Sequence, residues 1–319
     1  MAQPGHRLAP DERQQHVGEE QRSGDDEDDA ERPAGHLASV GSAPVTSDGG
    51  ILRPDLLDGR VALITGGGTN LGLQAAIELH AAGASVVIAG RRAELLEEAA
   101  ARVGERCIAV PGDIREAAAA AAIVRAAVAA HGRLDLLLNN AGGQYFGPAE
   151  EITGKGWRAV WRLNVEGTRN MTSAVCEHGF GEAGGLIVNV TVSPHRGYPG
   201  LAHTGAARAA VEAFTREQAA ALAPRGIAVV ALALGRFDTE SLRKYPPQVV
   251  RGAAASVPLQ RLGAMEEYGW LVGLLTGGIG RHLSGAVVTL DGALDDWDGP
   301  WPPRGVLSEE GVVPAEERR

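Results

Sequence analysis

Short apolar runs alternate with longer, alanine-rich stretches along the chain from about residue 56 to residue 290. The apolar runs, many of them rich in β-branched residues, are 61–65, 85–89, 107–110, 134–139, 185–190, 227–232 and 286–290. Helices are expected between them at 71–82, 93–103, 115–131, 156–178, 204–222 and 265–276. A strand that is apolar at every position is typical of a sheet covered on both faces. The pattern therefore predicts one α/β domain, a doubly wound parallel sheet in three layers, α/β/α.

The two ends of the chain depart from this pattern. Residues 1–50 hold 11 Asp and Glu against 4 Arg and have almost no apolar periodicity. Such a segment cannot bury enough surface to offset chain entropy, so we expect an acidic, disordered N-terminal extension. We place the folded domain at 51–294 and a C-terminal arm at 295–319. The arm holds Trp297 and Trp301, whose large apolar areas favour docking on the body or on a neighbouring subunit.

One segment inside the domain also breaks the alternation. Residues 236–259 carry several charges and the pair Pro246-Pro247. Because this segment follows a late strand, it should lie over the carboxyl edge of the sheet, where open α/β folds bind their ligands. We interpret it as a lid-like insertion over a substrate site.

Charge and composition exclude several classes of function. The formal net charge is −10, of which residues 1–50 contribute −7, so the acidity says little about the folded body. No basic stretch with interleaved aromatic residues indicates nucleic-acid binding. No apolar stretch has the length and flanks of a signal peptide or a membrane span, so a cytoplasmic protein is expected. Cys107 and Cys176 stand alone and the nine His are scattered, which predicts reduced core cysteines and no metal site.

The most informative motif follows the first predicted strand and runs Thr65-Gly66-Gly67-Gly68-Thr69-Asn70-Leu71-Gly72. A glycine-rich turn between a strand and a helix leaves backbone N–H groups at a helix N-terminus, where the pyrophosphate of a dinucleotide binds. Many such turns instead serve only close packing. We favour the first interpretation, in which the cofactor contacts are Gly66, Gly68, Thr69, Asn70, Leu71 and Gly72.

The end of the second predicted strand, Gly90-Arg91-Arg92, indicates which dinucleotide binds. At this distance from the turn an acidic residue normally binds the 2′-hydroxyl of the NAD ribose. Arg91 and Arg92 suit a 2′-phosphate instead, because guanidinium groups form charge-assisted hydrogen bonds with phosphate oxygens. The sequence therefore predicts NADP(H) as the cofactor.

From about Leu52 to Leu294 these elements resemble the classical short-chain dehydrogenase/reductase family, which has a Rossmann fold. The shared landmarks are the turn 65–72, Gly112-Asp113-Ile114, Asn139-Asn140-Ala141-Gly142, Asn164 and Leu290-Asp291-Gly292. Segments 142–150, 155–157 and 203–209 are most similar to the peroxisomal trans-2-enoyl-CoA reductase branch. Relatives pair through the helices that correspond to 156–178 and 204–222, so the resemblance implies a homodimer or homotetramer.

The resemblance also implies further cofactor contacts. Asp113 would accept a hydrogen bond from the adenine amino group, and Ile114 would flank the adenine ring. Asn140, Ala141 and Gly142 would line the wall beside the nicotinamide ribose. Thr239 falls where the family holds the nicotinamide carboxamide.

The catalytic positions depart from the family, whose mechanism uses Asn, Ser, Tyr and Lys. Only the asparagine is retained, as Asn164. The resemblance puts Thr204 at the tyrosine and Arg208 at the lysine, while the serine position is Val192, beside Thr191. Arg208 keeps a positive charge and can hydrogen-bond the cofactor ribose, but a guanidinium does not pass a proton.

The proton donor is therefore open. Thr204 can only hydrogen-bond, which suits a thioester oxygen that gains negative charge when hydride adds to the β-carbon. Tyr198, His195 and Tyr145 lie at the expected active-site edge and are weighed as donors, with Tyr198 preferred. The catalytic set predicted from the sequence is Asn164, Tyr198, Thr204 and Arg208. His203, one helical step from Thr204, is expected to point away into packing.

These observations favour an NADP-dependent oxidoreductase that reduces an α,β-unsaturated or carbonyl substrate, with an enoyl thioester as the favoured subclass. Two alternatives stay open, because the same substitutions fit them. The protein is then either a catalytically silent, cofactor-binding member of the fold or a non-redox dehydratase or cyclase. The sequence names neither the substrate nor the direction of the reaction.

Overall fold

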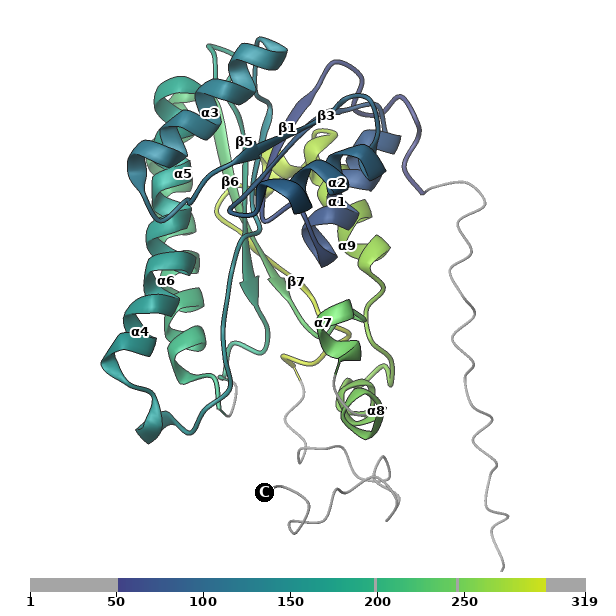
Figure 1. Cartoon of the computed structure of the whole chain (residues 1–319), viewed down its shortest axis with the longest axis vertical. Helices are drawn as coiled ribbons and strands as arrows, with labels where there is room; N and C mark the ends of the chain where they lie inside the picture. Colours follow the sequence, from purple (N-terminus) through teal and green to yellow (C-terminus); the bar gives the residue numbers. More distant parts are fainter. Residues whose placement is uncertain (1–50, 198–199, 245–246, 297–319) are drawn as a thin grey trace, which may run out of the picture. The chain divides into compact units, whose positions relative to one another are not determined.

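The structure of the chain is a computed structural model, and it describes residues 51–197, 200–244 and 247–296. Seven strands form one sheet (Figure 1): β1 (Val61–Thr65), β2 (Ser85–Gly90), β3 (Cys107–Pro111), β4 (Leu136–Asn139), β5 (Gly185–Val192), β6 (Ile227–Leu234) and β7 (Val287–Leu290). All neighbouring pairs are parallel, in the order β3-β2-β1-β4-β5-β6-β7. The sequence prediction of a doubly wound parallel sheet is confirmed.

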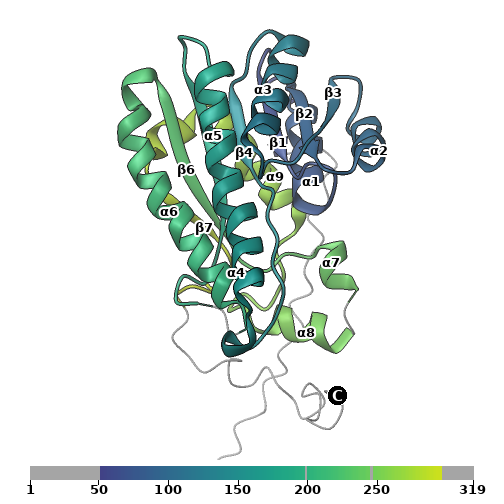
Figure 2. The same ribbon diagram turned by 60° about the vertical axis from the view of Figure 1, so that its left-hand side comes forward.

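Helices cover both faces of this sheet. They are α1 (Asn70–Ala81), α2 (Ala93–Val103), α3 (Ala117–His131), α4 (Gly154–Trp161), α5 (Gly167–His178), α6 (Ala202–Leu222), α7 (Glu240–Arg243), α8 (Pro247–Ala255) and α9 (Met265–Thr276). Figures 1 and 2 show α3, α5 and α6 on one face and α1, α2 and α9 on the other. Short 3-10 turns lie at Ala149–Glu151, Ala223–Arg225 and Ile279–Leu283. The predicted strands and most predicted helices agree with these bounds to within about two residues.

The strands are mostly apolar because their side chains enter two separate cores. On β1, Ala62 and Ile64 belong to the core under α1, α2 and α9, whereas Val61 and Leu63 belong to the core under α3, α5 and α6. All four are buried. A period of two along a strand that is covered on both faces leaves few positions for a polar side chain, such as Thr65 at the end of β1. This alternation explains why the strand signal in the sequence is a continuous apolar run.

The predicted helix 156–178 differs from the structure in its middle. The chain is helical on both sides, but the π-helical turn Arg162–Glu166 separates α4 from α5. A π-bulge adds a residue to the turn and is often found at functional sites. Here it buries Asn164, which has no exposed surface. Periodicity alone did not predict this interruption, because one extra residue barely changes an apolar pattern.

The order of the strands places the site. After β3 at the sheet edge the chain crosses to β4, which pairs with β1 on the side away from β2. The loops after β1 and β4 therefore leave the sheet in opposite directions, and a crevice opens between them at the carboxyl ends of the strands. Figure 1 shows α7 and α8 beyond these same strand ends. They belong to the segment 236–259 that the sequence predicts to be a lid.

Candidate active site

A cleft of about 950 Å³ lies at the carboxyl ends of the strands. Its walls come from the turns after β1, β2, β3, β4, β5 and β6, together with α7 and part of α8. All the residues predicted to contact the cofactor line this one cleft: Gly66, Gly68, Thr69, Asn70, Leu71, Gly72, Arg91, Arg92, Asp113, Ile114, Asn140, Ala141, Gly142, Arg208 and Thr239. The structure thus brings together residues that are up to 173 positions apart in the sequence.

The glycine-rich turn is held by the turn that follows β4. The Asn140 side chain donates to the Thr65 carbonyl oxygen at 3.0 Å, and the Ala141 N–H donates to the Thr65 hydroxyl at 3.0 Å. Thr69 is the N-cap residue of α1, yet its side chain makes no capping hydrogen bond, and the first turn holds no acidic residue. The N–H groups of this helix end are therefore open to an anion in the cleft.

Asn70 lies within the glycine-rich turn and connects it to the segment 236–259 that is predicted to be a lid. Its backbone is left-handed, with a φ of 46°, which asparagine tolerates better than most residues. The side-chain oxygen accepts from the Glu240 N–H at 3.1 Å, and the amide group donates to the Ser241 hydroxyl at 3.3 Å. Asn70 therefore joins the dinucleotide turn to the start of α7.

We expect Asn70→Gly to loosen the lid without unfolding the domain. Glycine adopts the left-handed backbone freely, so the turn itself survives, but both hydrogen bonds to α7 are lost. Two exposed hydrogen bonds contribute about 1–2 kcal/mol, so bound dinucleotide should dissociate roughly 5- to 30-fold faster. Stopped-flow displacement of NADPH measures this rate, and Ser241→Ala, which removes one of the two bonds, should give a smaller increase. An unchanged rate in both variants would contradict the connection.

The end of the cleft beside β2 and β3, where the adenosine is predicted to bind, is positively charged. Arg91 and Arg92 follow β2 and are exposed, so both guanidinium groups are free to reach a phosphate in the cleft. Asp113 is already paired, because Arg115 donates to both of its oxygens from Nε at 2.9 and 3.0 Å. The hydrogen bond from Arg115 lowers the pKa of Asp113 and keeps its carboxylate charged. The sequence analysis missed Arg115, although its spacing two residues after Asp113 suits such a pairing.

At the opposite end, Gly142, Asn164 and Arg208 converge. Arg208 on α6 donates from Nη1 to the Val190 carbonyl oxygen at 2.6 Å. Burial lowers the pKa of Arg208 to about 10, so its guanidinium remains charged at neutral pH. Asn164 donates to the carbonyl oxygens of Gly143 at 2.9 Å and Val160 at 2.8 Å. It therefore holds the loop after β4 in place from behind, and it is not itself part of the cleft lining.

Thr204 lies in a different place from the one the sequence predicts. It is 1% exposed and does not line the large cleft. Its hydroxyl has no hydrogen-bond partner among the residues that the structure describes, and it borders a second, smaller cavity behind Arg208. A direct hydrogen bond from Thr204 to a substrate oxygen is not supported by this position. Tyr198, the preferred proton donor, lies outside the described residues.

The two other aromatic candidates are also located. His203 is 1% exposed, and its ring meets the edge of the Tyr145 ring with the centroids 4.5 Å apart. This confirms that His203 points into packing. Tyr145 is 43% exposed, on the loop that precedes α4, and it does not line the cleft.

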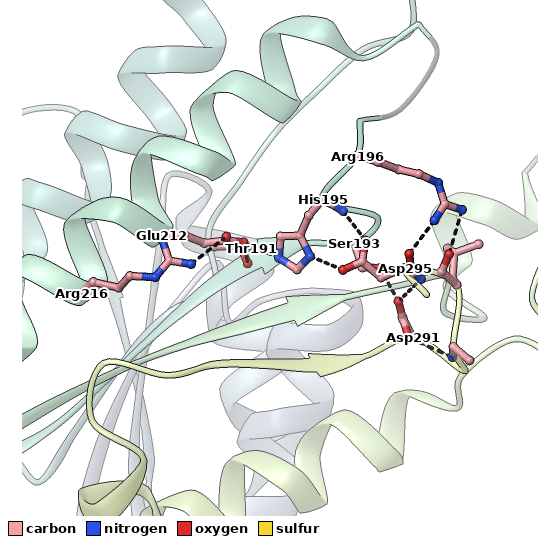
Figure 3. A network of polar contacts seen from close by, with 10 residues as sticks. Thr191, Ser193, His195, Arg196, Glu212, Arg216, Asp291 and Asp295 are labelled. Atoms are coloured by element: carbon pink, nitrogen blue, oxygen red, sulfur yellow. Dashed lines mark hydrogen bonds and ion pairs between the residues drawn. The ribbon is translucent and has the colours of Figure 1, made fainter. Parts of the chain in front are cut away.

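A polar network beside the cleft was not predicted (Figure 3). Ser193 lines the cleft and donates to the Asp291 carboxylate. His195 lies between Glu212 on α6 and Asp295 after β7, with its Nε2 2.9 Å from Glu212 Oε1 and its Nδ1 on Asp295 Oδ2. Asp291 was noted as a landmark, but the partners of His195 are 17 and 100 positions away in the chain. No local sequence signal connects them.

Two kinds of feature are absent from the described part of the chain. No helix there is long and apolar enough to cross a membrane. Across the same residues, no group of three or more His, Cys, Asp or Glu side chains is placed to hold a metal ion.

Comparison with known proteins is consistent across sequence and structure. The family model described as short chain dehydrogenase matches residues 60–249. A peroxisomal 2,4-dienoyl-CoA reductase of Danio rerio is 34% identical over 250 residues, which covers 76% of this chain and 83% of the relative. A probable 2,4-dienoyl-CoA reductase of Bacillus subtilis is 32% identical over 256 residues. This alignment covers 77% of this chain and the full length of the relative.

Two solved structures from Pseudomonas aeruginosa are similar to this fold. The citronellol catabolism dehydrogenase AtuB aligns with a TM-score of 0.69 at 35% identity and covers 77% of this chain and 99% of its own. The RhlG/NADP active-site complex aligns with a TM-score of 0.71 at 30% identity and covers 76% of this chain and all of its own. With its parallel sheet, its glycine-rich turn and these relatives, the chain belongs to the short-chain dehydrogenase/reductase family, in its enoyl-CoA reductase-like branch.

Proposed function

We propose that this protein is an NADPH-dependent reductase of α,β-unsaturated thioesters, of the enoyl or dienoyl type. The observation that carries the proposal is the nature of the cleft wall around Arg208. Among the described residues, this wall includes no tyrosine, and its one buried cation keeps its charge at neutral pH. The relatives named as 2,4-dienoyl-CoA reductases support the same substrate class.

The residues of the cleft fit a dinucleotide. The uncapped start of α1 offers N–H groups to a pyrophosphate. A Cβ atom at Gly72 would approach the Gly66 carbonyl oxygen to under 3.0 Å, so this glycine allows the tight turn that a bound pyrophosphate needs. Arg208 lines the end of the cleft where the nicotinamide ribose is expected. When bound, the nicotinamide supplies a hydride.

Arg208 and Thr239 are the protein groups that would orient the reacting end of the cofactor. Arg208 would donate to the ribose hydroxyls, and its fixed charge would stabilise negative charge that develops on a nearby thioester oxygen. Thr239 lines the cleft at the start of α7, with its hydroxyl accepting from the Leu242 N–H at 3.2 Å. Such a site stabilises an enolate well, and its described residues include no acid of its own to protonate an alkoxide. This difference favours carbon–carbon double bonds over ketones.

A simple assay tests the proposal. Purified protein is mixed with NADPH and its binding is followed by nicotinamide fluorescence. Loss of absorbance is then recorded with crotonyl-CoA, with a 2,4-dienoyl-CoA and with a ketone. Oxidation of NADPH by a thioester and little by the ketone is the expected result. Binding without oxidation by any substrate would indicate a silent cofactor-binding protein, and no binding would refute the proposal.

The choice of NADPH over NADH is proposed to depend on Arg91 and Arg92. We expect the double variant Arg91→Ala/Arg92→Ala to weaken NADPH binding by roughly 30- to 300-fold, because two charge-assisted hydrogen-bonding groups toward the 2′-phosphate are lost. NADH binding should change by less than about 3-fold, since NADH has no 2′-phosphate. Arg102→Ala, which removes an exposed arginine of α2 outside the cleft lining, is the matched control. Equal losses for the two nucleotides would contradict the assignment.

Assembly and location stay predictions. A homodimer or homotetramer is supported by apolar side chains that remain exposed in the single chain, namely Trp161 on α4, Leu274 on α9 and Ile279. Exposed apolar groups of this size are often covered by a partner subunit. The cytoplasmic location predicted from the sequence has no direct structural support.

A further inference from the structure

A second cavity lies directly behind the cleft wall. Its volume is about 30 Å³, enough for one or two water molecules, each of which needs roughly 10–15 Å³. Thr204, Arg208, His195 and Glu212 contribute polar groups to its lining. Two of these groups, the Thr204 hydroxyl and the Arg208 Nε, are buried and have no hydrogen-bond partner among the residues that the structure describes. Buried polar groups are rarely left unpaired, so the cavity is built to hold ordered water.

The small cavity adjoins the large cleft. Val192, Leu201 and Arg208 line both, so these side chains form the partition between them. Arg208 presents its Nη1 to the Val190 carbonyl oxygen and leaves its Nε unpaired. A water molecule on Nε would thus lie beside the guanidinium at the boundary of the two cavities.

A chain of hydrogen-bonded groups connects this cavity to solvent. The side chain of His195 is 34% exposed, and its Nε2 lies 2.9 Å from Glu212 Oε1. Glu212 is buried to 5% exposure and also accepts from the Thr191 hydroxyl at 2.9 Å. On the other edge of the ring, Asp295 accepts from the His195 backbone N–H at 2.6 Å and binds Nδ1 (Figure 3).

The charged groups around His195 favour its protonated form. Burial lowers the pKa of His195, but the hydrogen bond to Asp295 and the charges of Glu212 and Asp295 together outweigh burial and raise it. Further groups face the pair from each neighbouring element. Arg216 on α6 lies 3.9 Å from Glu212, Arg196 donates to the Asp295 carbonyl oxygen, and Asp291 accepts from the Asp295 N–H at 2.8 Å. Arg208 borders the same cavity on its inner side.

We propose that the proton consumed by reduction passes from His195 through Glu212 to the water of this cavity. From this water it passes beside Arg208 into the cleft. The inference rests on the proposed function. It assigns an acid that is absent from the described residues of the cleft wall.

The step balances as follows. Hydride from the dinucleotide forms a C–H bond at the substrate and leaves an enolate. The cavity water releases one proton past Arg208 into the cleft, where it reaches the substrate carbon, and takes one from Glu212, which receives the Nε2 proton of the imidazolium. Neutral His195 then regains its Nε2 proton from solvent, to which its side chain is 34% exposed. Arg208 keeps all its protons and only orients the water, because its guanidinium does not titrate at neutral pH.

Kinetics on variants test the route. We expect His195→Gln and Glu212→Gln to lower kcat by about 10- to 100-fold, the usual contribution of a positioned acid, with KM for thioester and NADPH within about 2-fold. In the wild type, kcat should fall as the pH rises through the pKa of His195, and this falling limb should vanish in both variants. His282→Gln, an exposed histidine outside both cavities, is the control. Wild-type kcat and pH profile in His195→Gln would overturn the proposal.

Two measurements keep the test independent of variant folding. NMR titration of the His195 ring in the wild type gives its pKa directly, and this value should match the kinetic one. A mismatch would overturn the route even if no variant folds. A high-resolution crystal structure should show water within hydrogen-bonding distance of Thr204 Oγ1 and Arg208 Nε, and a dry cavity would also overturn it.

The same design separates the two proposals. Failure of the wild type to oxidise NADPH with any thioester refutes the proposed function, whatever diffraction shows in the small cavity. Normal turnover with a dry cavity or an unchanged His195→Gln variant refutes only the proton route.

Discussion

Replacing Gly72 by alanine is expected to abolish dinucleotide binding. A Cβ atom there would lie under 3.0 Å from both the Gly66 carbonyl oxygen and the Asn140 amide nitrogen, closer than real Cβ atoms approach. Neither neighbour can move cheaply. Gly66 belongs to the backbone of the turn, and Asn140 is held by its hydrogen bond to Thr65. The turn must therefore open, which removes the N–H groups from their place at the start of α1.

The expected size of this effect is at least 100-fold in the dissociation constant for NADPH, or about 2.7 kcal/mol. Overpacking of a close-packed turn should also destabilise the protein by about 1–3 kcal/mol. Fluorescence titration measures the first quantity and urea unfolding the second. Gly181→Ala serves as the control, because a Cβ atom at Gly181 meets nothing within 4 Å. If Gly72→Ala binds NADPH within about 3-fold of the wild type, the turn is not the pyrophosphate site.

Gly142→Ala should have the second large effect, at the opposite end of the cleft. A Cβ atom there would come under 3.0 Å from both Arg208 Nη2 and Asn164 Oδ1. Arg208 is anchored on its other side by its hydrogen bond to the Val190 carbonyl oxygen. The Asn164 side chain is held by its hydrogen bonds to the carbonyl oxygens of Gly143 and Val160. The added methyl group therefore displaces the guanidinium from the nicotinamide end of the site.

For this variant we expect kcat to fall by roughly 100-fold or more, because a small misplacement of an orienting group costs about that much. NADPH binding should weaken by less than about 10-fold, since the adenosine contacts lie at the other end of the cleft. Gly143→Ala is the matched comparison. Its Cβ would meet only the Leu163 side chain, at 2.9 Å, and that flexible group can move aside. Steady-state kinetics that rank the two variants equally would show that the contact with Arg208 is unimportant.

The fold, and the cleft that brings together the residues predicted to bind the cofactor, could be predicted from the sequence because their signals are local. A continuous apolar run reports a strand buried on both faces, and a glycine-rich turn reports a close approach of the backbone at a helix start. The residues predicted to contact the cofactor consequently all line one cleft. The order of parallel strands then brings the separate turns to the same edge of the sheet.

The catalytic end was predicted less well, because alignment with a family motif gives a position in the chain and not a direction in space. Thr204 stands at the tyrosine position, yet its hydroxyl faces the small cavity and not the cleft. Asn164 was singled out as a family landmark and a catalytic residue, but its place behind the loop follows from the π-helical turn, which an apolar pattern does not reveal.

By itself, then, the sequence determined the parallel α/β sheet, the glycine-rich turn and the arginine pair beyond β2. Each of these depends on residues that are close together in the chain. Only the tertiary structure decided which distant polar groups meet, such as His195 with Glu212 and with Asp295, 17 and 100 positions away. The physical reason is that propensity and periodicity record how one element is buried, whereas a hydrogen bond between elements depends on how they cross.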